Sequence, residues 1–158
     1  MPYTLLATRL PELARRETRM LVVPDGDPDG LPPDSYAFLE GFCDEPGCDC
    51  RRAVFFVRSV KRNRIEAVIG WGWEDRRFYV RWLGEDEPLL VDRLRGPSLE
   101  LAASQGEYAD LLLSILADGL SDPGFGELVR AHYAAFRRCI EAEAAQDCDR
   151  ASDCGHDH

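Results

Sequence analysis

The sequence contains no apolar run that approaches the ~20 residues needed for a membrane-spanning helix, which excludes an integral membrane protein of the helical type. It also lacks the charged-then-apolar start of a secretory signal peptide, because Arg9 and Glu12 interrupt the candidate stretch. We therefore expect a cytoplasmic protein. Since the cytoplasm keeps thiols reduced, its six cysteines are candidate metal ligands before they are candidate disulfides.

The motifs of several common enzyme classes are missing as well. The chain has no Walker loop, no HExxH, no GxSxG, and no deaminase pairing of His-x-Glu with Pro-Cys-x-x-Cys. Histidine is scarce: there are 3, and two of them are His156 and His158 at the end of the chain. Acid–base chemistry would therefore fall to carboxylates or to His132. These absences favour a protein that is not an enzyme.

Positive charge is in deficit, because the net charge is −10. A nucleic-acid binder draws much of its affinity from neutralising phosphates, so this balance disfavours one. The charge is nevertheless uneven, with a net of −6 over residues 1–50, +4 over 51–95 and −8 over 96–158. The basic middle either offers a local surface to an anionic ligand or complements the acidic ends, and we expect the second.

What the sequence does contain is a series of short β-type runs, followed by helical patterns. A helix at 11–17 is followed by expected strands at 18–23, 36–43, 53–60, 65–73 and 78–83, with a loop at 24–34 and a polar turn at 61–64. Connections this short favour an antiparallel arrangement, because parallel pairs need crossovers of about a dozen residues. The sheet is therefore predicted to be a meander of about four to five strands.

Two helices are predicted after the sheet. Ser104 is a candidate cap for the first, which ends near Leu116, and Pro123 lies in the first turn of the second. The predicted fold class is thus α+β, an antiparallel β-meander covered by two C-terminal helices. Residues 1–145 form a single domain, and residues 146–158 form an acidic tail, poor in apolar residues, that we expect to be disordered.

The strongest signal is the segment Cys43-Asp-Glu-Pro-Gly-Cys48-Asp-Cys50-Arg-Arg, which connects two predicted antiparallel strands. Zn²⁺ prefers a tetrahedron of thiolate and imidazole ligands, and three thiolates on a tight turn suit it. Arg51 and Arg52 are expected to offset the surplus negative charge and to lower the thiol pKa values. The sequence therefore predicts one structural Zn²⁺ in a hairpin loop, held by these cysteines.

The fourth ligand is less constrained by the spacing. His132 is the first candidate: it lies on the apolar face of the last helix, where a lone histidine is more often a core residue, but three ligands lack a fourth. The alternatives are Cys139, Asp49, water, or the tail residues Cys148, Cys154, His156 and His158. The tail is also a candidate second metal site, although each bond there must offset the ordering of the chain.

The segment Tyr36-Ala-Phe-Leu-Glu-Gly-Phe-Cys-Asp-Glu-Pro-Gly-Cys-Asp-Cys-Arg-Arg resembles the hallmark of an uncharacterised bacterial family, some of whose members carry SEC-C-type metal motifs. Glu17-Thr18-Arg19 and His132-Tyr133 are similar to that family too, so the resemblance covers about residues 5–140. It implies metal binding and no particular activity. The later Cys-Cys or His-Cys pair of the SEC-C pattern is absent here, so that ligand set is not carried over.

The expected function is that of a small zinc-binding domain, non-enzymatic, which binds a protein partner or serves in regulation. Two alternatives stay open. One is a nucleic-acid-binding module that uses the basic region 51–81, where basic residues decorate one predicted hairpin turn and aromatic residues populate the next hairpin. The other is a thiol redox switch, or a zinc enzyme, that uses Cys48 and Cys50.

Overall fold

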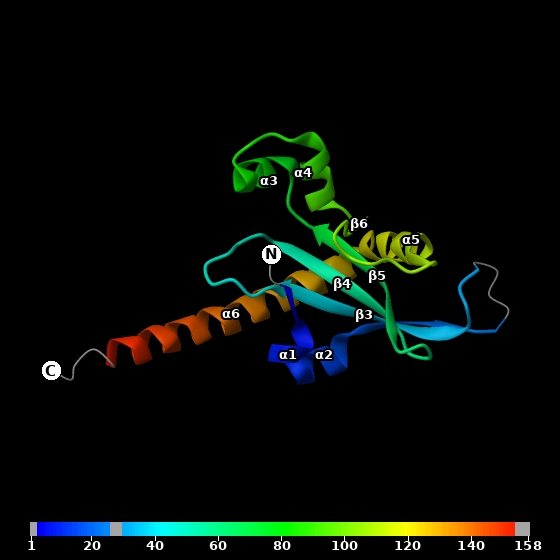
Figure 1. Ribbon diagram of the computed structural model, residues 1–158, viewed down its shortest axis with the longest axis horizontal. Helices are drawn as coiled ribbons and strands as arrows, with labels where there is room; N and C mark the ends of the chain where they lie inside the picture. Colours follow the sequence, from blue (N-terminus) through cyan, green and yellow to red (C-terminus); the bar gives the residue numbers. More distant parts are fainter. Residues whose placement is uncertain (1–2, 26–29, 154–158) are drawn as a thin grey trace.

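A three-stranded antiparallel meander is the centre of the fold (Figure 1). The computed structural model describes residues 3–25 and 30–153. Its elements are β1 (Tyr3–Leu5), α1 (Leu6–Arg9), α2 (Pro11–Glu17), β2 (Arg19–Val23), β3 (Asp34–Cys43), β4 (Arg52–Ser59), β5 (Arg64–Gly72), α3 (Arg76–Leu83), α4 (Pro88–Arg95), β6 (Ser98–Leu99), α5 (Ala109–Leu120) and α6 (Pro123–Asp153).

The remaining strands extend the meander at both sides. β1 and β2 pair with the two ends of β3, and β6 pairs with β5, so the sheet has 6 strands in the order β1-β3-β4-β5-β6 with β2 also on β3. All five pairings are antiparallel. The predicted α+β class, with an antiparallel sheet and C-terminal helices, is confirmed.

One face of the sheet packs against α5 and α6. Alternate residues of β3 to β5 supply this core, since side chains alternate between the two faces of a strand. Phe42 is fully buried and contacts the rings of Phe136 and Tyr133 of α6 at centroid distances of 5.6 and 5.8 Å. Burying a side chain of this size contributes about 1.5–3 kcal/mol, so the register of β3 positions α6 over the sheet.

The predicted strand at 78–83 is wrong, because this segment is helix α3. The Asp75 carboxylate accepts a hydrogen bond from the Phe78 backbone N–H at 2.9 Å, which caps the first turn, and Gly84 (φ 81°) ends the helix. Tyr79 is buried in a small cluster with Val91 and Leu94 of α4. A short apolar run fits a strand or a helix equally well, and here the cap and the α4 contact decide.

The predicted start of the first C-terminal helix at Ser104 is also wrong, because α5 begins at Ala109. The intervening residues run beside β5 instead: the Gln105 amide bonds both backbone groups of Val68, at 2.9 and 3.0 Å. The Gly106 N–H donates to the Glu66 carbonyl at 2.8 Å. These bonds give partners to backbone N–H and C=O groups of β5, and a helix starting at Ser104 would leave those groups without partners.

Helix α6 begins at Pro123 as predicted but runs to Asp153. Residues 146–153 are therefore helical, whereas the composition predicts a disordered tail there. Residues 154–158 lie outside the described part. The sequence from Glu141 to Gln146 is made of Glu, Ala and Gln, which have high helix propensity and allow a helix without core contacts. Among the described residues, no helix is both long and apolar enough to cross a membrane.

Candidate metal centre

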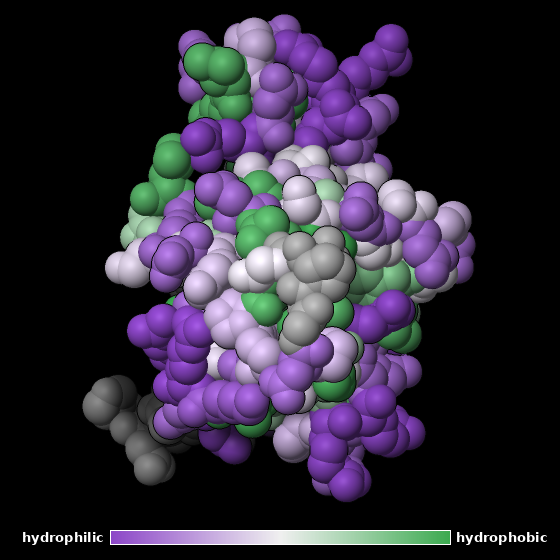
Figure 2. All heavy atoms as spheres, turned by 90° about the vertical axis from the view of Figure 1, so that its right-hand side faces the viewer, coloured by the Kyte–Doolittle hydropathy of each residue, from purple (hydrophilic) through white to green (hydrophobic). Residues whose placement is uncertain are grey.

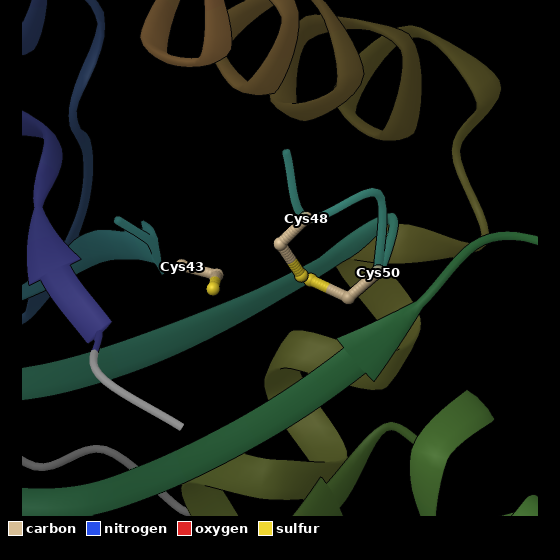
Figure 3. A group of neighbouring side chains, drawn as sticks. All are labelled: Cys43, Cys48 and Cys50. Atoms are coloured by element: carbon tan, nitrogen blue, oxygen red, sulfur yellow. The ribbon is translucent and has the colours of Figure 1, made fainter. Parts of the chain in front are cut away.

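The three predicted cysteines lie together in the connection between β3 and β4 (Figure 3). Cys43 is the last residue of β3, and Cys48 and Cys50 belong to the loop that leads to β4. Their Sγ atoms all lie within 4.8 Å of one another. Cys43 and Cys50 are fully buried and Cys48 is half-buried, so the group sits under the surface with one open side.

The donor set fits a soft or borderline divalent cation. In a regular tetrahedron with Zn–S bonds near 2.3 Å, sulfur atoms are about 3.8 Å apart, so closure of this group around an ion requires each separation to shorten by at most about 1 Å. Burial raises the pKa of Cys43, Cys48 and Cys50. The thiols therefore hold their protons until a cation displaces them.

Two arginines counter the effect of burial on these thiols. Arg137 lowers the pKa of Cys43, and Arg52 lowers that of Cys50, although burial dominates at both. The guanidinium of Arg51 instead pairs with Asp49 at 2.9 Å and with Glu74 at 3.1 Å. Of the two arginines predicted to balance the site, Arg52 acts on a thiol, while Arg51 has another role.

Helix α6 holds the backbone of the cysteine loop. Arg137 donates to the carbonyls of Cys43 at 2.7 Å and Glu45 at 2.9 Å. Glu141, one turn on, pairs with Arg137 at 2.6 Å and accepts a hydrogen bond from the Gly47 N–H at 2.9 Å. Gly47 has φ 74°, a conformation that favours glycine, and this conformation aims its N–H at the helix. The first half of the loop is thus fixed to α6.

Tyr133, one turn before Arg137, holds the second half of the loop. Its hydroxyl accepts from the Arg51 N–H at 3.2 Å and donates to Asp49 at 3.3 Å. Burial raises the pKa of this hydroxyl well above its ordinary value, so it remains a donor at neutral pH. Residues 133, 137 and 141 share one face of α6, since positions four apart are neighbours on a helix.

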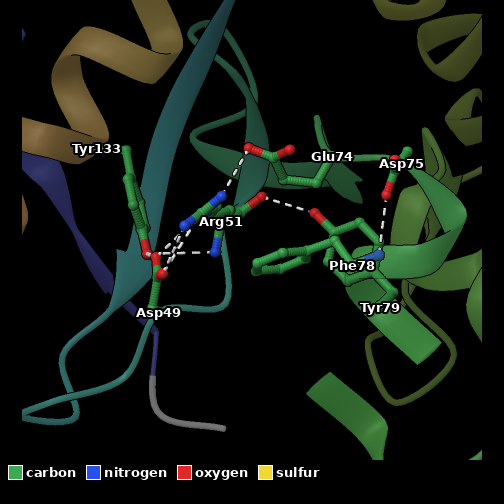
Figure 4. A network of polar contacts seen from close by, with 7 residues as sticks. All are labelled: Asp49, Arg51, Glu74, Asp75, Phe78, Tyr79 and Tyr133. Atoms are coloured by element: carbon green, nitrogen blue, oxygen red, sulfur yellow. Dashed lines mark hydrogen bonds and ion pairs between the residues drawn. The ribbon is translucent and has the colours of Figure 1, made fainter. Parts of the chain in front are cut away.

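Arg51 connects the loop to α3 (Figure 4). Its guanidinium lies 4.6 Å from the centre of the Phe78 ring, and its carbonyl accepts a hydrogen bond from the Tyr79 hydroxyl at 2.8 Å. Burial raises the pKa of Tyr79 to about 12, so that donor stays protonated too. A single loop residue therefore contacts both α3 and, through its N–H, α6.

Arg52 makes a second set of connections on the other side of the loop. Its buried side chain donates to the Leu94 carbonyl at the end of α4 and to the Tyr3 hydroxyl, both at 2.8 Å, and pairs with Glu100 at 3.3 Å. Gly70 makes room for it, because a Cβ there would lie 2.6 Å from an Arg52 nitrogen. The residues after Cys50 thus join β1, α4 and the segment after β6.

His132, the predicted fourth ligand, lies elsewhere. Its Nδ1 is 2.8 Å from Glu40 and its Nε2 is 2.8 Å from Glu17, so both ring nitrogens face carboxylates. Burial lowers the pKa of His132, but hydrogen bonds and charge from Glu40 and then Glu17 outweigh it, and the pKa is raised. Within the described residues, the group that could hold a metal ion consists of the three cysteines and does not include His132.

The other candidate ligands are also outside this group. Asp49 is engaged by Arg51 and Tyr133. Cys139 is half-buried and Cys148 is exposed, and neither belongs to the group. Cys154, His156 and His158, together with any second metal site that they would form, lie outside the described residues.

Sequence reasoning missed Tyr133, Arg137 and Glu141. Their spacing of four places these polar groups in one row along the helix, which is a usable signal for a helix face that contacts something polar. Nothing in the sequence identifies the β3–β4 loop as that partner. Glu40 carried a clearer signal, because it alternates with Phe38 and Phe42 on the core face and therefore needs a buried cationic or hydrogen-bonding partner.

Comparison of the chain with protein-family models, curated proteins and solved structures gave no match. The fold and the site together define an α+β domain with a three-cysteine group, in a loop between two strands, that is able to hold a metal ion.

Proposed function

We propose that this chain is a zinc-binding domain in which Cys43, Cys48 and Cys50 hold one structural Zn²⁺, and that the domain binds a protein partner and is not an enzyme. The observation that carries the proposal is the approach of three sulfur atoms within 4.8 Å of one another, two of them fully buried. Thiolates are ligands that zinc prefers, and the three approach one another closely enough to share an ion.

A structural role is supported by what surrounds the thiols. The loop from residue 44 to residue 51 has one internal backbone hydrogen bond among the described contacts, from Cys48 N–H to the Glu45 carbonyl at 3.2 Å. The neighbouring elements α6, α3 and β1 all contact this loop. Zinc supplies cross-linking of the loop to the end of β3, and such binding free energy adds directly to folding free energy.

Solvent is the fourth ligand that the arrangement supports best. His132 is held by Glu40 and Glu17, and Asp49 is held by Arg51 and Tyr133. Cys139 and Cys148 do not belong to the three-cysteine group, so no described side chain takes the fourth position. Membership of the SEC-C-related family that the Tyr36–Arg52 segment resembles is part of this proposal.

Metal analysis of the purified protein tests the proposal. We expect about one zinc per chain and loss of that zinc in Cys48→Ser. Cys139→Ser is the matched control, because Cys139 lies outside the three-cysteine group, and it should keep the ion. Removal of zinc by a chelator should lower the midpoint of thermal unfolding. Protein that takes up no zinc after reconstitution, or that melts at the same temperature with and without it, would contradict the proposal.

The nucleic-acid alternative gains little from the geometry. In the basic turn, Arg64 pairs with the buried Glu66 at 2.7 Å and Arg62 lies 3.5 Å from the same carboxylate. Arg58 donates to Asn63. Trp71 and Trp73 pack against the core and are only partly open. The redox alternative, which uses Cys48 and Cys50, has the same thiols as the zinc site and stays a prediction.

A further inference from the structure

Strand β2 forms an open edge of the sheet. Arg19–Val23 pair with β3 on one side, and in the described part of the chain no other strand pairs with them. Figure 1 shows β2 along the margin of the sheet that lies away from β4. Met20 is 47% exposed and Val22 is 69% exposed, so apolar side chains of this edge face solvent.

This edge lacks the usual protection against pairing. Natural proteins blunt exposed edges with lysines, prolines, bulges or inward charges. The five residues of β2 are Arg-Met-Leu-Val-Val, with Pro24 only after the strand has ended. The only charged side chain of the strand, Arg19, packs within the same molecule, because its guanidinium lies 4.2 Å from the centre of the Phe125 ring. The backbone groups on the outer side of β2 are thus available to another strand.

A small apolar cavity of about 240 Å³ lies beside the same strand. It is lined on the sheet side by Arg19, Met20, Leu21 and Phe38 and on the helix side by Ile115, Leu116, Gly119 and Phe125. A strand added to β2 would place alternate side chains beside Leu21 and the others beside the exposed Met20 and Val22. Both faces of an added strand would therefore meet apolar surface.

Hydrophobic surface also continues around the nearby end of the molecule. Figure 2 views the end that carries α5 and the connection between β2 and β3, and it shows hydrophobic atoms near that connection among polar ones. The exposed large apolar residues of the chain include Val22, Val60 and Leu111, with 69%, 54% and 39% of their surface open. An added strand at β2 would cover only the first of these, which provides a control.

We propose that β2 is a dimerisation edge, at which it pairs antiparallel with β2 of a second copy around a two-fold axis through Leu21. In this register Leu21 lies opposite Leu21 of the partner, Met20 opposite Val22, and Arg19 opposite Val23. Residues directly opposite in an antiparallel pair share one face. The exposed Met20 and Val22 therefore cover each other, while the two Leu21 side chains meet on the cavity side.

Self-pairing suits this edge because a two-fold interface must be complementary to itself. The register uses all five residues and places no charge opposite a like charge. Moving the axis to Val22 would bring Met20 opposite Pro24, which cannot donate a hydrogen bond to the ladder. Pro24 thus disfavours that shift, and the axis through Leu21 uses the whole strand.

The net charge sets the expected salt dependence. Each copy carries −10, so the two repel at long range, and salt screens that repulsion over a Debye length of about 8–10 Å. The dimer should therefore tighten as salt is raised. An oppositely charged foreign partner at this edge would show the reverse. A strand pair of this length buries less than the about 1,200 Å² of a standard stable interface, so the dimer is reversible.

Sedimentation velocity of the purified protein over about two orders of magnitude in concentration, at low and high salt, tests the proposal. We expect a monomer–dimer equilibrium that strengthens with salt. Val22→Lys should weaken it at least about tenfold, since it places two lysines beside the axis. Val60→Lys, an equally conservative surface change in the β4–β5 turn, should leave the dimer intact. Thermal unfolding of each variant verifies that it is folded.

Hydrogen exchange supplies a second readout. The outward amide groups of β2 should become protected as the concentration rises, and those of the β4–β5 turn should not. Three results would overturn the proposal: a monomer at every concentration and salt, equal dimerisation of Val22→Lys and Val60→Lys, or concentration-dependent protection that omits β2. Self-association that weakens as salt is raised would also overturn it, because repulsion between two like-charged copies predicts the opposite.

Discussion

Replacement of Arg137 by methionine removes the clamp between α6 and the cysteine loop while keeping most of the apolar length of the side chain. Arg137 makes two hydrogen bonds to loop carbonyls, at 2.7 and 2.9 Å, and its side chain is 12% exposed. Hydrogen bonds to a charged group contribute about 1.5–3 kcal/mol each, and water replaces part of that at the exposed end. Methionine and arginine have similar helix propensities, so α6 itself should persist. We expect the free energy of unfolding to fall by about 2–4 kcal/mol.

The same change tests whether the loop is preorganised for a metal. Without the Arg137 hydrogen bonds, part of the metal-binding free energy is used to order the backbone at Cys43 and Glu45. A loss of about 1.4–2.8 kcal/mol in this way weakens metal binding about tenfold to hundredfold. Urea unfolding of the metal-free protein measures the first effect, and competition with a chromophoric chelator for zinc measures the second.

Arg138→Met is the matched control for both measurements. Arg138 is the next residue of α6 and is exposed, and within the described part of the chain its side chain has no hydrogen bond or ion pair. It should behave like the unaltered protein in both assays. If Arg137→Met and Arg138→Met had the same stability and the same zinc affinity, the clamp would have no energetic role. A loss of stability without a loss of affinity would keep the clamp but reject preorganisation.

Three other changes probe the packing around the site. Gly72→Ala should lower the unfolding free energy by about 1–3 kcal/mol in urea, because its Cβ would lie 2.6 Å from the Leu94 carbonyl oxygen. Gly124→Ala should not, because its Cβ would make an ordinary contact, 3.5 Å from an Asp122 carboxylate oxygen. Phe42→Ala should cost about 3–5 kcal/mol in the same assay, since that ring is fully buried; a loss under about 1 kcal/mol would contradict the packing. The pKa of His132 is raised, so its stabilising effect is complete below about pH 6.5 and is lost as pH rises through the folded-state value. The excess stability of the unaltered protein over His132→Gln should therefore shrink as the pH is raised above about 6.5, and a pH-independent difference would refute the ion pairs.

The central strands were predictable because their pattern is strong. Residues 36–43, 53–60 and 65–73 were expected as strands, and the structure has β3, β4 and β5 within two residues of those bounds. β1 and β6 have 3 and 2 residues and are too short to show a period of two. The error at 78–83 has a physical origin, since the decisive Asp75 cap and the α4 contact are not visible in the hydrophobic pattern.

The cysteine group was predictable for a different reason. A short loop between antiparallel strands has its ends fixed by the sheet, so three cysteines in such a loop are constrained to lie near one another. The position of His132 was not determined in this way. Its place on the apolar face of α6 predicted that it is buried, but which group it meets depends on how the helix crosses the sheet. Glu40 is the group that it meets.

The contacts of the cysteine loop alternate between two kinds of constraint. Sheet pairing fixes β3 through Cys43 and β4 from Arg52, and α6 fixes the backbone at residues 45, 47 and 51. Among the described contacts, Cys48 and Cys50, which lie between these points, make no hydrogen bond to α6. A cation on the three sulfur atoms would act at the positions that the helix leaves without a hydrogen bond. Arg51 and Arg52 come directly after Cys50 and hydrogen-bond to α3, α4 and β1, so constraint at Cys50 is transmitted to elements outside the loop.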